Sequence, residues 1–221
     1  MNAFRFTADM LHLTAMLLLL AKLWQSKSSA GLSALSQVLF ALVYTTRYLD
    51  LFLNFFSIYN TTMKITYISI TYTTVLSIYL KFKETYDRKT DPHLLAMGLV
   101  ILSTVLALVF NHEFQTLEIF WTFSIYLESV AILPQLYVIS KTGRPEAVTV
   151  QYLTFLGMYR ALYIVNWIYR YYTQGYFDMI AIGAGCVQTF LYIDFLYLYI
   201  TKETITTLIQ KEEKLNLITN I

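Results

Sequence analysis

The chain has 221 residues, of which 57% are hydrophobic and only 14% are charged. Soluble domains carry roughly 25% charged residues, so this composition, with a mean hydropathy of +0.53, is typical of a polytopic membrane protein. A net charge of +2 does not favour nucleic acid as a partner, while membrane lipid is expected to surround the chain. The single cysteine and three scattered histidines exclude disulfides and thiolate clusters and give no zinc-site spacing, so no cofactor or metal is expected.

Seven mostly apolar stretches follow one another along the chain, each of about the 20 residues needed to cross a bilayer. They cover residues 4–24, 33–54, 62–81, 94–111, 115–138, 148–170 and 177–200. Short polar connections separate them, and Pro134 is expected to kink the fifth helix. The sequence thus predicts an all-α polytopic membrane protein with seven transmembrane helices over residues 1–200 and a tail over residues 201–221.

The first stretch has some features of a secretory signal peptide. Arg5 precedes it, and Ser28-Ser29-Ala30 resembles a cleavage site. However, Asp9 and His12 interrupt the apolar run, and lysines follow it. We therefore expect a helix that stays in the protein, with its N-terminus outside the cytosol.

The distribution of basic residues predicts the orientation of the helices. Eleven of the sixteen lysines and arginines follow the first, third, fifth or seventh stretch. The positive-inside rule then places these connections and the C-terminus in the cytosol, and the N-terminus in the lumen or exterior. The other five basic residues break this pattern: Arg5, Arg47, Lys64, Arg160 and Arg170.

Charges inside apolar stretches need a physical reason, because each costs roughly 2.5–3.5 kcal/mol at the bilayer centre. Helical spacing places many of these side chains on shared faces. One face carries Tyr44, Arg47 and Asp50; another carries Glu118, Trp121, Glu128 and Gln135; a third carries Tyr159, Tyr163, Asn166 and Arg170, beside Arg160 and Trp167. If these faces converge, they line one lumenal cavity that holds both signs of charge.

Simpler interpretations apply to several of these residues. Arg47 and Asp50 could form a local ion pair, Trp121 and Trp167 could belong to interfacial belts, and His12 could be a satisfied core histidine. A carboxylate as deep as Glu128 is either protonated or hydrogen-bonded to a donor such as a tyrosine. Structural pairing is the default expectation for Arg160 and Asp194.

No catalytic motif accompanies these charges. The chain has no HExxH, no GxSxG and no glycine-rich phosphate loop. Glu118 and Glu128 are about 15 Å apart by helical rise, too far for joint acid–base work. An enzyme is therefore not expected.

A weak internal repeat suggests how the helices are arranged. Ser26 precedes Gln37 by eleven positions, and Ser140 precedes Gln151 by the same number. Both pairs lead from an odd-numbered stretch into the next. This spacing is compatible with two parallel three-helix repeats joined by the fourth helix, as in some transporters.

Distinctive motifs occur in residues 1–6, 36–41, 47–52 and 121–136, together with Tyr159-Arg160, Asn166-Trp167 and Arg170-Tyr171. These segments resemble the KDEL receptor family. The resemblance covers nearly the whole chain up to about Lys202. It implies a SWEET- or PQ-loop-like fold of two three-helix bundles and a linker. It also implies a receptor in endoplasmic reticulum (ER) and Golgi membranes that retrieves ER luminal proteins carrying a C-terminal Lys- or His-Asp-Glu-Leu type tail.

The resemblance further implies roles for individual side chains. Arg47 would hold the terminal carboxylate of the tail, Arg5 its Glu and Arg170 its Asp. The basic first residue would meet Asp50, Glu118 and Trp121. Asp178 would position Arg170, while Tyr48, Tyr163, Asn166 and Trp167 would complete the pocket. His12, coupled to Tyr159 and Glu128, would make binding tighter in the more acidic Golgi.

The cytosolic tail departs from the family pattern, in which a lysine cluster after the last helix is read by coatomer (COPI). Lys202 is followed by Glu203, and later lysines alternate with acids in Lys211-Glu212-Glu213-Lys214. The tail signal is thus atypical, although coatomer is still an expected partner. The alternative function is a small-solute, sugar-like transporter on the same fold, against which three pocket arginines count.

Overall fold

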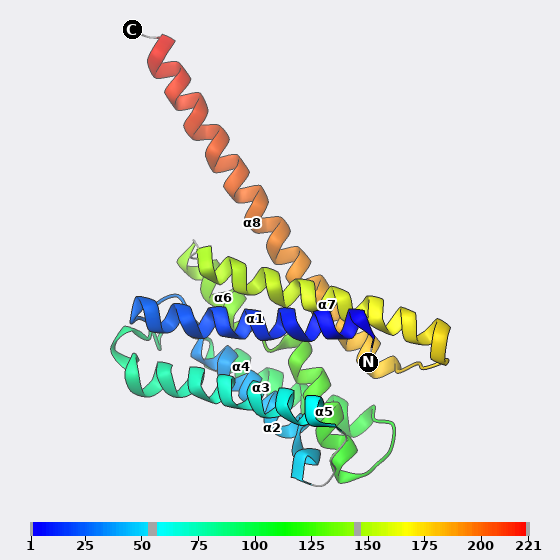
Figure 1. The fold of residues 1–221 in the computed structure, drawn as a ribbon. Coiled ribbons are helices and arrows are strands. Elements are labelled where there is room, and N and C mark those ends of the chain that lie inside the picture. Colours follow the sequence, from blue (N-terminus) through cyan, green and yellow to red (C-terminus); the bar gives the residue numbers. More distant parts are fainter. Residues whose placement is uncertain (1, 53–56, 144–146, 220–221) are drawn as a thin grey trace.

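The computed structural model describes residues 2–219 except 53–56 and 144–146, and leaves the side chains of residues 52, 147–148 and 202–219 undescribed. The described chain is mainly helical (Figure 1). The long helices are α1 (Ala3–Ser26), α2 (Ala34–Arg47), α3 (Ile58–Leu76), α4 (His93–Val109), α5 (Thr116–Val130), α6 (Leu133–Thr142), α7 (Ala147–Gln174) and α8 (Met179–Thr219). Short helical turns follow α2 (Leu49–Phe52) and α3 (Ser77–Lys81 and Lys83–Thr85).

Each of the seven apolar stretches is mainly helical over its described residues, but the fifth is divided into α5 and α6. Pro134 lies in the first turn of α6, where its missing N–H leaves no intrahelical bond unmade. The Ser36 hydroxyl donates to the Ala131 carbonyl at the break, with a separation of 2.6 Å. The expected kink is therefore a full break between two helices.

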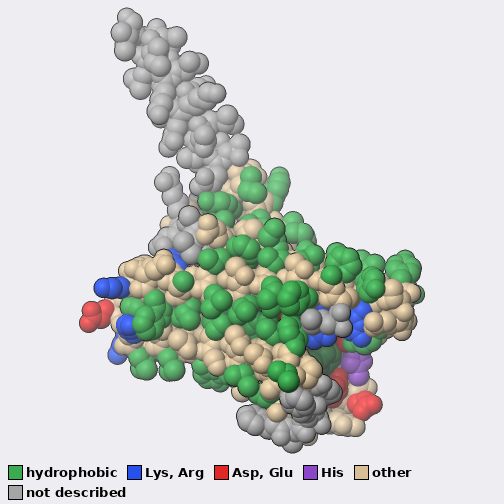
Figure 2. Space-filling model, in the orientation of Figure 1, with side chains coloured by type: hydrophobic (Ala, Val, Ile, Leu, Met, Phe, Trp, Pro, Cys, Tyr) green, Lys and Arg blue, Asp and Glu red, His purple; other side chains and the backbone are tan. Residues whose placement is uncertain are grey.

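Three segments are long and apolar enough to cross a membrane by length and composition: α1, the α5–α6 segment Thr116–Thr142, and Met179–Thr201 of α8. The shorter helix α4 is also apolar. Among the described residues, α2 has only 14 residues and is too short for this criterion, and α3 and α7 are not among the segments that meet it. Hydrophobic side chains cover the middle of the long face in Figure 2, and most visible charges lie toward its two ends. The chain is an all-α membrane protein.

Side chains at helix starts and turns fix where the helices begin and end. Asn2 and Ser33 accept hydrogen bonds from backbone N–H groups three residues ahead and so cap α1 and α2. Gly143 ends α6 at a φ of 85°, a left-handed conformation that favours glycine. Gln135 was expected on the face of Trp121 and Glu128. Instead it lies past the break, where it binds the Ser33 N–H and the Gly31 carbonyl.

The helix contacts are compatible with the two repeated halves that the sequence suggests. The helix α1 packs on α7, and α2 packs on α5; within the halves, α2 and α1 contact α3, while α7 and α5 contact α8. Exchanging α1 with α5, α2 with α7, and α3 with α8 maps each of these pairs onto another. The helix α4 packs on α5 and, less extensively, on α2. The buried core between them includes Leu19, Leu23, Val43, Leu127, Ile132 and Leu153.

Candidate ligand-binding site

A cavity of about 350 Å³ lies inside the helical bundle. Its walls come from α1, α2, α3, α5, α7 and the start of α8, so the polar faces predicted from helical spacing do converge. Four arginines and one lysine line it together with four carboxylates. Of the sequence-predicted site residues, Glu118 alone is not among its lining residues; the others are Arg5, His12, Arg47, Tyr48, Asp50, Trp121, Glu128, Tyr159, Tyr163, Asn166, Trp167, Arg170 and Asp178.

Glu128 is the centre of a buried charge cluster at the floor of the cavity. Its side chain is about 2% exposed. Its Oε2 atom lies 2.5 Å from Arg47 Nη1 and 2.7 Å from Arg160 Nη2, and Tyr159 donates a 2.6 Å hydrogen bond to Oε1. Helices α2, α5 and α7 thus meet at one carboxylate. The expected tyrosine donor and the expected structural pairing of Arg160 are both confirmed.

Arg47 and Asp50 do not pair with each other, so the local ion-pair interpretation is wrong. The helix ends at Arg47, and the following turn points Asp50 toward α3. Arg47 donates to the Ser124 hydroxyl and carbonyl, each at 3.0 Å, in addition to its contact with Glu128. Asp50 instead accepts from Lys64, with a separation of 2.6 Å.

Asp9 organises the side of the cavity nearest the start of α1. It accepts hydrogen bonds from Tyr163 at 2.5 Å and Tyr59 at 2.9 Å, and lies 4.0 Å from Arg5 Nε. Nearby, Asn166 accepts a 2.7 Å hydrogen bond from Asn2. These contacts join α1 to α3 and α7 and hold Arg5 beside the cavity.

Arg170 and Asp178 are linked through an aromatic ring. The guanidinium carbon of Arg170 lies 3.7 Å from the centre of the Tyr176 ring, and the Tyr176 hydroxyl donates to Asp178 at 3.3 Å. Asp178 also caps α8 by accepting from the Ala181 N–H, and its Oδ1 lies 3.3 Å from His112 Nε2. Any positioning of Arg170 by Asp178 in this conformation therefore passes through Tyr176.

Glu118 lies in a neighbouring cavity of about 520 Å³. Trp121 and Asp178 line both cavities, so Glu118 faces a side extension of the central one. Trp121 and Trp167 both line the central cavity, so a place in an interfacial aromatic belt does not by itself describe them. Trp167 also packs directly on Gly185 of α8, where an added Cβ would come within 2.5 Å of the indole ring.

His12 is buried and connected to the charge cluster by aromatic contacts. Its ring stacks on Tyr159 at a centroid distance of 4.1 Å and an interplanar angle of 5°. It shares a 2.8 Å hydrogen bond with the Tyr44 hydroxyl, and Tyr67 lies 4.8 Å away between ring centres. Since Tyr159 also bonds Glu128, a continuous chain of contacts runs from His12 to Arg47.

The sequence interpretation missed several cavity residues, chiefly Asp9, Tyr59, Tyr67 and Lys64. Two of them carry a signal in the sequence. Asp9 is an acid within an apolar stretch, and Lys64 breaks the positive-inside pattern.

The fold and the cavity define an all-α membrane protein with an internal cavity lined by charges of both signs. The family model described as "ER lumen protein retaining receptor" matches residues 28–170 of the chain. The chain is also 60% identical over 202 residues to "ER lumen protein-retaining receptor 2" of Gallus gallus and of Homo sapiens, covering 91% of this chain and 95% of each relative. The protein of the same name from Danio rerio is equally similar.

The chain therefore belongs to the ER lumen protein retaining receptor family. This result confirms the resemblance drawn from the sequence motifs. It favours the receptor over the small-solute transporter considered as the alternative.

Proposed function

We propose that the protein is a pH-dependent receptor that binds the C-terminal KDEL- or HDEL-type signals of ER luminal proteins in the Golgi and returns them to the ER. The observation that carries this proposal is the presence of Arg5, Arg47 and Arg170 around one cavity inside a membrane-embedded bundle. The signal has two acidic side chains and a terminal carboxylate, and so presents three anions to these three cations. The names of the relatives, ER lumen protein-retaining receptors, support the same class of cargo.

Arg47 is the proposed partner of the terminal carboxylate. A guanidinium has five N–H donors, and Arg47 directs three contacts to Ser124 and Glu128. The remaining donors, together with the one now facing Glu128, allow a fork-like contact with an incoming carboxylate. Tyr159 and Arg160 would then continue to hold Glu128.

The other arginines lie where the acidic side chains of the tail can reach them. Arg5 is held near Asp9 on α1, and Arg170 is held by Tyr176 near the end of α7. We assign Arg5 to the ligand Glu and Arg170 to the ligand Asp. The wall lined by Tyr48, Tyr163, Asn166 and Trp167 completes the pocket, and Asp178 positions Arg170 through Tyr176.

The basic first residue of the tail would be received by Asp50, Glu118 and Trp121. Carboxylates and an indole face are the groups that attract a cation. Trp121 lies where the central cavity meets the extension lined by Glu118. Asp50 already binds one ammonium group, that of Lys64, which shows the kind of contact this carboxylate makes.

The pH dependence is assigned to His12. An unperturbed imidazole titrates near pH 6.5, in the range where compartments differ. If the bound state accommodates the protonated ring better than the empty state does, linkage requires tighter binding as the pH falls. The contacts from His12 through Tyr159 and Glu128 to Arg47 supply the physical connection.

The cellular assignments extend the proposal. The N-terminus would be lumenal, the C-terminus cytosolic, and residues 201–221 would form the tail through which coatomer is recruited. The tail's charged side chains lie outside the described residues. As a receptor the protein would bind and release cargo unchanged, with no enzymatic step and no cofactor.

The test is binding of a tetrapeptide-tailed ligand to the purified protein at about pH 5.5 and about pH 7.4. The free-acid tail should bind more tightly at the lower pH, and the same peptide with an amidated C-terminus should bind weakly at both. Equal binding of the acid and the amide would refute the role of Arg47 and the receptor proposal. A proteoliposome flux assay with small sugars should show no transport.

A further inference from the structure

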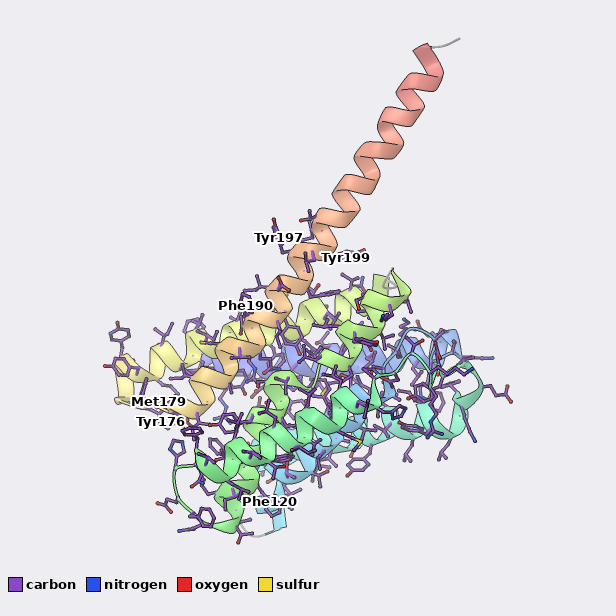
Figure 3. All side chains as sticks on the ribbon, turned by 180° about the vertical axis from the view of Figure 1, so that it is seen from behind. Phe120, Tyr176, Met179, Phe190, Tyr197 and Tyr199 are labelled. Atoms are coloured by element: carbon purple, nitrogen blue, oxygen red, sulfur yellow. The ribbon has the colours of Figure 1, made fainter. Side chains whose placement is uncertain are left out.

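A second concave region lies on the outside of the bundle, away from the charged cavity. It is a groove of about 720 Å³ between α4, α5 and the first turns of α8. Its sides carry exposed apolar residues, among them Val109 (64% exposed), Met179 (70%) and Val187 (50%). Its floor is formed by small buried residues, including Ser103, Ser129 and Ala184. Figure 3 shows α4 and the start of α8 on this face, with Met179 near one end.

The groove has the length and polarity of one bilayer leaflet. It follows residues 102–109 of α4 with the adjoining Phe110, and residues 179–187 of α8, which is about 12 Å by helical rise. The hydrocarbon core of a bilayer is about 30 Å thick, or about 15 Å per leaflet. The groove walls are mainly apolar, and one end is formed by Asn111 and His112 at the α4–α5 connection. Apolar walls with a polar end match the two parts of a lipid.

Gly183 keeps the groove open on the α8 side. A Cβ added there would meet no atom within 4 Å, whereas a Cβ on Gly185, two residues further on, would strike Trp167. The free space beside Gly183 is therefore open groove, while Gly185 is needed for packing inside the bundle. A larger side chain at position 183 would project into the groove without first displacing the protein.

We propose that this groove binds one acyl chain of a membrane phospholipid, with the polar head at the level of Asn111 and His112. Three apolar helices form its walls, and two of them belong to segments that can cross a membrane. In such a setting an open apolar groove of leaflet length is filled by a lipid tail, because water there would leave apolar surface hydrated. The site is separate from the charged cavity and does not depend on the proposed receptor function.

The experiment is photolabelling of the full chain in phosphatidylcholine vesicles doped with a phosphatidylcholine that carries a diazirine in one acyl chain. Adducts are mapped by mass spectrometry of peptides. We expect labelling of Leu106 and Val187 in the groove to exceed that of Phe190 and Ile193, which are exposed on α8 outside it. Gly183→Leu should lower groove labelling several-fold.

Gly98→Leu is the matched control, because Gly98 lies exposed on α4 with the same open space at its Cβ but outside the groove. It should leave groove labelling unchanged. If Gly183→Leu does not fold, Val187→Phe narrows the same groove and should have the same effect. Equal labelling inside and outside the groove would overturn the proposal by showing ordinary boundary lipid. Unchanged labelling in folded Gly183→Leu would also overturn it.

Discussion

Replacing Glu128 by Gln is the most informative single perturbation, because it removes the only anion in direct contact with Arg47 and Arg160 among the described ion pairs. The side chain keeps its size, so packing changes little. The Tyr159 hydroxyl can still donate to the amide oxygen. What changes is the charge at the point where α2, α5 and α7 meet.

The expected cost follows from the geometry of this cluster. Both arginine nitrogens contact the same Glu128 oxygen, at 2.5 and 2.7 Å, and so lie no more than about 5 Å apart. At an effective dielectric constant of about 20, two unit charges at that separation repel by about 3 kcal/mol. Breaking a buried ion pair by removing one partner typically costs about 3–5 kcal/mol. We expect Glu128→Gln to lower the free energy of unfolding by about 3 kcal/mol or more.

The assay is equilibrium unfolding in mixed micelles, followed by tryptophan fluorescence. Glu118→Gln is the control on the same helix and should cost less than about 1 kcal/mol, since Glu118 is partly exposed and accepts only a long hydrogen bond from Thr122. The double variant Glu128→Gln/Arg160→Gln should recover more than about 1 kcal/mol relative to Glu128→Gln, because the repulsion is gone. A cost for Glu128→Gln no larger than that of Glu118→Gln would refute the reasoning.

Three further predictions concern ligand binding and packing. Arg47→Lys should weaken binding of a free-acid tail at least about tenfold, or about 1.4 kcal/mol, because an ammonium cannot form the two-pronged contact; calorimetry that shows equal affinity would contradict this. His12→Ala should flatten the rise in affinity between about pH 7.4 and about pH 5.5, and an unchanged profile in a binding titration would remove His12 as the sensor. Gly185→Ala should destabilise the fold by about 1–3 kcal/mol through contact with Trp167, whereas Gly98→Ala should not; equal unfolding midpoints would argue against this packing.

The sequence by itself determined the class of protein and the positions of its helices. Seven apolar stretches of bilayer length, joined by short polar connections, leave a chain no other way to satisfy its backbone in a membrane than by forming helices. Arg5, Arg47, Arg160, Arg170 and Lys64 also stood out from sequence alone, because each breaks the positive-inside pattern. All five line the central cavity.

Only the tertiary structure decided which charges meet. Arg47 and Asp50 are one helical turn apart in sequence, yet Arg47 pairs with Glu128 and Asp50 with Lys64. The reason is that α2 ends at Arg47, and the turn that follows directs the Asp50 side chain toward α3. Helical spacing placed Gln135 with Glu128, but the break before α6 redirects Gln135 to the turn that precedes α2. Periodicity describes one helix at a time, whereas an ion pair between helices depends on how those helices pack and where each one ends.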